Sequence, residues 1–177
     1  KIGIRATDSI LLDGESSQGF PSGVFSTVQP EAKGNSRGVD IYSGSLSARN
    51  GARISATTLG EGDAGKIVIR ATDTILLDGD TSQGLVSGVF STVQPGAKGN
   101  SGGVEIESDS LTVTNGAEID ATTFGEGDAG KIGIRATDSI LLDGESSQGF
   151  PSGVFSTVQP EAKGNSRGVD IYSGSLS

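Results

Sequence analysis

Apolar and polar residues alternate in short segments along the whole chain. In residues 66–78, Ile67 and Ile69, and then Ile75 and Leu77, occupy every second position. This period of two predicts β-strands, because successive side chains of a strand point to opposite faces. Clusters of Gly, Asn, Asp and Pro separate the segments, as turns require. No stretch combines helical spacing with helix caps, so we expect an all-β chain without helices.

The strand pattern repeats with a period of 65 residues. The segment KIGIRATDSILLDG at Lys1 returns as KIVIRATDTILLDG at Lys66 and in its first form at Lys131. The repeat units are residues 1–65, 66–130 and 131–177, of which the last is incomplete. The first two units differ at 17 positions, whereas the third repeats residues 1–47 letter for letter. We therefore expect two alternating units and a true period of 130 residues.

Each unit divides further into two coils of chain. Aligning residues 103–130 with residues 66–102 superposes three short alternating segments in each, with an insertion in the long coil at about residues 80–87. The long coils are residues 1–37, 66–102 and 131–167, and the short coils are residues 38–65, 103–130 and 168–177. Three short strands per coil predict a right-handed parallel β-helix, a single β-solenoid segment over residues 1–177.

Stacked coils place equivalent residues beside one another in ladders. One inward ladder is predicted to contain Ile2, Val39, Ile67, Val104, Ile132 and Val169. Differences between the units spare such inward positions, apart from the change of Ala48 to Val113, which stays apolar. One outward position breaks the alternation of apolar and polar residues, because it holds a leucine in every unit: Leu11, Leu76 and Leu141. We expect the insertion, which carries Phe20, Leu85 or Phe150, to fold back and cover this leucine.

Two outward columns are candidates for function. The first is a threonine column of Thr27, Thr57, Thr92, Thr122 and Thr157. Its neighbouring column reads Phe25, Ser55, Phe90, Asp120 and Phe155, so no flat threonine array of the ice-binding kind is expected. The second column reads Arg5, Tyr42, Arg70, Glu107, Arg135 and Tyr172. It predicts cation–π and ion-pair contacts between adjacent coils, and a candidate adhesive face for a sugar or a partner protein.

Composition narrows the chemistry that the chain can perform. The hydrophobic share is 33%, below the roughly 45–50% of globular domains, which favours a narrow core. The chain has no Cys and no His, so it lacks a thiolate nucleophile and the commonest general base. Its net charge of −9 disfavours nucleic-acid binding, and no apolar run is long enough to insert into a membrane.

The acidic residues recur in every unit, which is typical of turns and not of one active site. Asp8, Asp13 and Glu15 return as Asp73, Asp78 and Asp80, and the turn GEGDAGK holds Glu61 and Asp63. We therefore predict no catalytic, cofactor-binding or metal-binding residue and no cofactor, with structural calcium in a turn as the alternative. The glycine-rich stretches lack the spacing of a phosphate-binding loop.

The repeat motifs resemble a known group of proteins. GDAGKIVIRATDTILLDG, SGVFSTVQPGAKGNSGGVEI and SLTVTNGAEIDATTFGEGDAG are similar to the repeat region of filamentous-haemagglutinin-like exoproteins, in the form common in cyanobacteria. The resemblance covers the whole chain. It implies a right-handed parallel β-helix, export by a two-partner route, and a role at the cell surface or in the extracellular matrix. The N-P-N-G and N-P-N-L motifs of the family's secretion domain are absent, so we expect the secretion signal outside this sequence.

These patterns together predict a non-catalytic structural segment. We expect the shaft of a secreted or cell-surface fibre or adhesin, located extracellularly, with both ends covered by more of the same chain or by a neighbouring copy. Self-association end to end or in a filament is the expected partnership. The alternatives are a carbohydrate-binding or carbohydrate-cleaving β-helix and a module that recognises a cell-surface glycan or protein.

Overall fold

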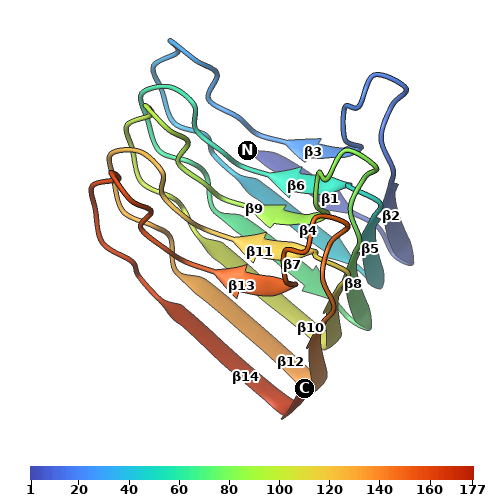
Figure 1. Ribbon diagram of the computed structural model, residues 1–177. Coiled ribbons are helices and arrows are strands. Elements are labelled where there is room, and N and C mark those ends of the chain that lie inside the picture. The colour runs from blue at the N-terminus through green and yellow to red at the C-terminus, as the bar shows by residue number, and fades with distance from the viewer.

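The protein consists of β-strands and turns and contains no helix. The computed structural model describes residues 1–177 (Figure 1). Its strands are β1 (Ile2–Arg5), β2 (Ser9–Asp13), β3 (Gly23–Phe25), β4 (Val39–Ser43), β5 (Ser45–Arg49), β6 (Arg53–Ser55), β7 (Ile67–Ala71), β8 (Thr74–Asp78), β9 (Gly88–Phe90), β10 (Val104–Thr114), β11 (Glu118–Asp120), β12 (Ile132–Asp143), β13 (Gly153–Phe155) and β14 (Val169–Leu176). The all-β prediction is confirmed.

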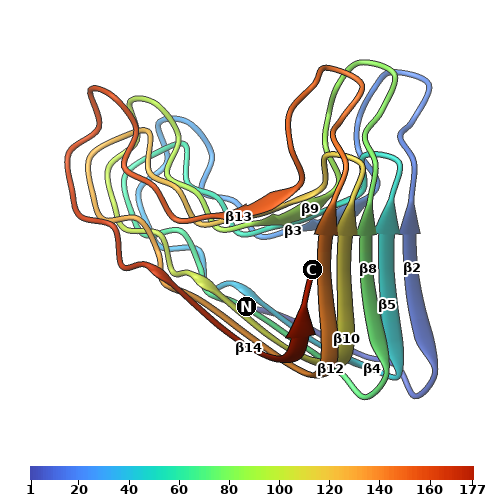
Figure 2. The ribbon, with the colours of Figure 1, turned by 60° about the horizontal axis from the view of Figure 1, so that its bottom comes forward.

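The strands form two parallel sheets. The larger sheet has nine strands in the order β1-β4-β7-β10-β8-β5-β2, with β12 beside β10 and β14 beside β12. The smaller sheet has five strands in the order β13-β11-β9-β6-β3. Figure 2 shows that the larger sheet curls, so that β4 and β14 lie along one side, β2 and β8 along a second, and the smaller sheet faces them.

The curl occurs within continuous strands at one end of the molecule. The sequence predicts separate strands before and after this corner, but β10, β12 and β14 each run through it. A register shift between Ser108 and Ser110 marks the bend in β10. The corner is a bulge and not a loop, because the inter-strand pairing resumes directly after it.

The pairing register places equivalent residues of the repeat beside one another. Ile2 pairs with Val39, Val39 with Ile67, and Ile67 with Val104, and the ladder continues through Ile132 to Val169. The predicted order of this ladder is therefore confirmed. The interior holds a cluster of 24 buried hydrophobic residues drawn from both sheets. Full burial of each aliphatic side chain contributes about 1.5–3 kcal/mol, so this narrow core is the main source of stability.

In the first and third units the insertion leaves the outward leucine exposed, and there the prediction is wrong, whereas Leu76 and Leu85 of the second unit are half-buried. Leu11 is 58% exposed and Phe20 is 67% exposed. An antiparallel bridge between Glu15 and Pro21 closes the insertion on itself, and the Ser16 N–H donates to the Phe20 carbonyl at 2.8 Å. The same bridge joins Asp80 to Val86. Each insertion is thus a small hairpin that satisfies its own backbone, and it projects beyond the ends of the strands that it follows, β2, β8 and β12 (Figure 2).

Candidate functional site

The outer face of β1, β4, β7, β10, β12 and β14 carries two adjacent columns of charged, aromatic and small residues. One column runs through Arg5, Tyr42, Arg70, Glu107, Arg135 and Tyr172. The other runs through Gly3, Asp40, Val68, Glu105, Gly133 and Asp170. These residues alternate with the buried ladder, because odd and even positions of a strand point to opposite faces. We call this surface the charged face.

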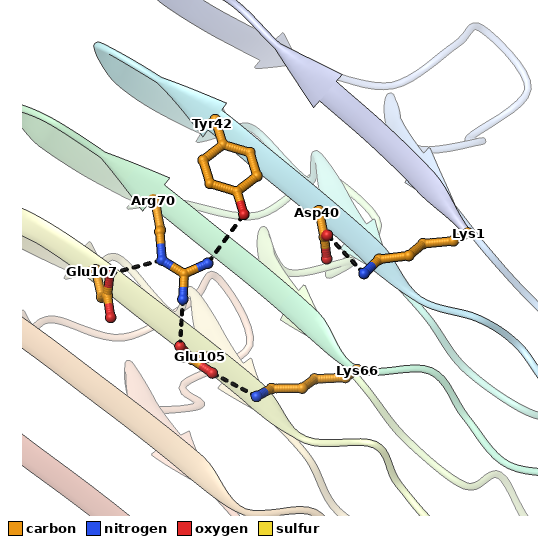
Figure 3. Close-up of polar contacts among 7 residues, drawn as sticks. All are labelled: Lys1, Asp40, Tyr42, Lys66, Arg70, Glu105 and Glu107. Carbon is orange, nitrogen blue, oxygen red and sulfur yellow. Dashed lines mark hydrogen bonds and ion pairs between the residues drawn. The ribbon is translucent and has the colours of Figure 1, made fainter.

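Arg70 is the centre of the hydrogen-bond network on the charged face (Figure 3). Its Nε donates to a Glu107 oxygen at 2.8 Å, and its Nη2 donates to Glu105 at 2.6 Å. Its Nη1 donates to the Tyr42 hydroxyl at 3.3 Å. One guanidinium thus joins the outward side chains of β4 and β10 on either side of its own strand, a geometry that suits the planar fork of Arg.

Lysines at the strand entrances hold the carboxylates of the second column. The pairs are Lys1 with Asp40 at 2.7 Å, Lys66 with Glu105, and Lys131 with Asp170 at 2.6 Å. In each pair the lysine comes immediately before one strand, and its ammonium reaches the carboxylate of the adjacent strand. The carboxylates are therefore fixed in position but remain at the surface, with acceptor capacity to spare.

The tyrosines of the charged face stack against arginines from neighbouring strands. The Arg5 and Arg70 guanidinium carbons lie 4.7 Å and 5.7 Å from the centre of the Tyr42 ring. The Arg135 guanidinium carbon lies 5.1 Å from the centre of the Tyr172 ring. These contacts confirm the cation–π and ion-pair contacts predicted from the alternating column.

The ion pairs keep the charged face ionised without stabilising the fold strongly. A hydrogen bond from Lys66 holds the pKa of Glu105 below its usual range. The hydrogen bond to Glu107 raises the pKa of Arg70. Because the Arg70 side chain is 35% exposed and that of Glu107 is 43% exposed, this pair contributes only about 0–1 kcal/mol. The network therefore positions side chains more than it holds strands together.

A hollow of about 330 Å³ lies on the charged face over β10, β12 and β14. Gly133 forms part of its lining, and the register places Gly133 directly between Glu105 and Asp170. Arg135 and Tyr172 line the same hollow. The two columns thus bring carboxylates, a guanidinium and an aromatic ring together around a position that has no side chain.

A second cluster lies on the outer face of the smaller sheet and was missed by the sequence analysis. The guanidinium carbon of Arg53 lies 4.4 Å from the centre of the Phe90 ring, and its Nε donates to the Val86 carbonyl at 3.0 Å. Glu118 and Asp120 lie nearby on β11. Burial raises the pKa of both carboxyl groups, and burial lowers the pKa of Arg53.

The sequence signal for this second cluster was the pair of changes between the first two units. Glu118 replaces Arg53, and Asp120 replaces Ser55, at equivalent positions. The assignment of these positions to the outer face is correct. The recurrence of acidic residues in every unit does not extend to Glu118 and Asp120, which adjoin each other in the second unit alone, and Asp120 is only 9% exposed. Alternation reveals which face a side chain occupies but not whether its neighbours cover it.

The threonine column is also less exposed than its outward position suggests. Thr57, Thr92 and Thr122 are 8%, 3% and 2% exposed. The Thr57 and Thr92 hydroxyls lie 3.0 Å apart, and those of Thr122 and Thr157 lie 2.9 Å apart. The hydroxyls therefore satisfy one another along the ladder, and the middle of the column presents no flat surface to solvent.

The recurring carboxylates lie in turns and cross-strand contacts. Asp13 accepts hydrogen bonds from Arg49 and Asn50, and Asp63 accepts one from the Asn100 N–H at 2.8 Å. Glu61 pairs with Lys33 at 2.9 Å. No group of three or more acidic residues is arranged to hold a metal ion. These contacts connect adjacent strands and turns.

The fold and the charged face define an all-β protein built on parallel, in-register strands. Comparison of the chain with family models, with curated proteins and with solved structures gives no match. No helix long and apolar enough to cross a membrane is present.

Proposed function

We propose that the chain is a non-catalytic shaft segment of a large secreted or cell-surface fibrous protein, an adhesin or an extracellular filament. In this proposal the strands follow the right-handed, three-strand coil of a parallel β-solenoid, with long and short coils alternating at the boundaries predicted from the sequence. Its work is to provide length and stiffness along the direction in which the strands stack.

The observation that supports this proposal is the unbroken ladder from β1 to β14. Each strand pairs in parallel with its equivalent in the next part of the repeat, and the apolar residues beneath form one continuous core. With six strands about 4.8 Å apart, the ladder spans roughly 24 Å. A structure in which every layer repeats the one before can be lengthened without changing its cross-section.

The resemblance to exoprotein repeats supports an extracellular or cell-surface location for the segment. The free edges of β1 and β14 would pair with further layers, supplied by the same chain or by a second copy in a filament. Labelling of intact cells with an antibody against the segment tests the location. Labelling that appears only after the cells are lysed would contradict it.

A change in length tests the shaft function. Residues 48–177 make up one full 130-residue period, and they can be duplicated in tandem at the end of the chain. Small-angle X-ray scattering should then show an unchanged cross-sectional radius and a particle longer by about 19 Å, the height of four added layers. An increase in the cross-sectional radius together with the length, as for one larger globular domain, would contradict the proposal.

A further inference from the structure

The hollow on the charged face exists because Gly133 has no side chain. The backbone conformation at this position does not call for glycine. Gly133 lies inside β12 and does not have a positive φ. A Cβ atom placed there would meet no other atom within 4 Å. The equivalent residue of the second unit is Val68, so the strand accepts a branched side chain at this position. A glycine inside a strand often marks a place where a ligand approaches the backbone closely.

The groups around Gly133 provide donors, acceptors and an aromatic surface. Lys66 and Lys131 hold the carboxylates of Glu105 and Asp170 on either side of the glycine. Arg135 makes no ion pair, so its guanidinium has N–H groups free to donate. The Tyr172 side chain at the rim is 59% exposed and stacks against Arg135.

The charges around the hollow cancel. The three cationic side chains are those of Lys66, Lys131 and Arg135, and the three anionic ones are those of Glu105, Glu107 and Asp170. For a ligand with a net charge, attraction to the side chains of opposite sign would be offset by repulsion from those of like sign. A neutral ligand with many hydroxyl groups can instead donate to the carboxylates and accept from the guanidinium. Its C–H face can pack against the tyrosine ring.

We propose that this hollow binds an uncharged pyranose residue of a polysaccharide. The volume of about 330 Å³ is at the lower end of the range for small-molecule sites, as one sugar ring would need. A second hollow of about 630 Å³ shares Glu107 and Arg135 with the first and provides space for adjoining sugars. The site therefore suits a sugar within a chain, and it goes beyond the structural role proposed above.

Filling the hollow is the direct test. Gly133→Val installs the residue that the second unit carries naturally, and Gly3→Val makes the same change on β1, outside the hollow. The full chain is titrated with maltohexaose, cellohexaose and mannohexaose and followed by amide chemical shifts. At least one of these sugars should shift the amides of Gly133, Arg135 and Tyr172. Gly133→Val should weaken that binding at least about tenfold, and Gly3→Val should leave it unchanged.

Tyr172→Ala provides a second variant, because it removes the stacking surface without touching a buried residue. It should also weaken binding, with the circular dichroism spectrum unchanged. The proposal is overturned if none of the three hexasaccharides shifts these amides. It is equally overturned if Gly133→Val binds as the parent does, or if only an acidic oligosaccharide binds and high salt abolishes that binding. None of these results depends on whether the chain lengthens as a shaft.

Discussion

Truncation of one side chain in the middle of the core tests whether the ladder of buried isoleucines forms one continuous hydrophobic core. Ile106 belongs to a ladder that runs from Ile4 at one edge to Ile171 at the other, and it is 0% exposed. Ile106→Ala removes three carbon atoms, which corresponds to about 2.4 kcal/mol of transfer free energy. A residual cavity of about 70 Å³ would add roughly 1.7 kcal/mol. The expected loss in the free energy of unfolding is therefore about 4 kcal/mol.

The matched control lies in the same ladder. Ile4 belongs to the edge strand β1, is half-buried and has a paired strand on one side only. Ile4→Ala should therefore cost about half as much, because its neighbours can relax and water already reaches the site. Both variants are measured by urea unfolding, with far-UV circular dichroism and tyrosine fluorescence as two probes of the same transition. Equal losses for Ile106→Ala and Ile4→Ala would refute the continuous core.

Two further predictions concern a strained turn and a buried charge. Glu31 has a φ of 64°, whereas Gly96 has a φ of 78° at the equivalent position of the second unit and no atom within 4 Å of its Cβ position. Glu31→Gly should therefore raise the free energy of unfolding by about 0.5–1 kcal/mol, and Gly96→Ala should lower it by about 1 kcal/mol; a lower urea midpoint for Glu31→Gly or a higher one for Gly96→Ala would disprove the strain. Burial raises the pKa of Asp120, so its ionisation costs stability as pH rises above the unfolded-state value of about 4. Asp120→Asn should gain about 1 kcal/mol at pH 7 and nothing near pH 3. Asp128, whose pKa is lowered mainly by the Asn165 N–H, should give the opposite sign at pH 7 when changed to Asn, and the same sign for both variants would contradict the assignment.

The period-two pattern was sufficient to predict the strand class and the order of the core ladder. In a repeat of parallel strands the pairing partner of Ile67 is its own equivalent, so finding the repeat also finds the register. The alternation of Arg and Tyr in the charged face was predictable for the same reason. Each of these predictions depends only on which residues occupy the same position in successive repeats. An alignment of the repeats identifies those residues.

The wrong predictions concern the burial of outward side chains. The repeat shows which residues occupy equivalent positions, but it does not show whether neighbouring side chains bury them. Leu11 and Phe20 were expected to meet because both are apolar, but the hairpin closes on its own hydrogen bonds and leaves both exposed. Conversely, Asp120 was assigned to an outward position, but its side chain is buried on the outer face of the smaller sheet. Both outcomes depend on how neighbouring outward side chains pack. The hollow at Gly133 is a third example, since it is created by the residues on either side of a glycine.

The turns that follow the smaller sheet alternate in charge from one layer of strands to the next, in step with the 65-residue repeat. Lys98 and Lys163 lie on either side of Glu126, at 3.6 Å and 3.0 Å. Deleting one layer would bring a KGN turn beside another KGN turn, or an EGD turn beside another EGD turn. Like charges directly opposite one another in a ladder are destabilising. Alternating turns therefore disfavour the loss or gain of a single layer, so a shaft of the proposed kind would lengthen most readily by pairs of layers, which keep lysine beside glutamate.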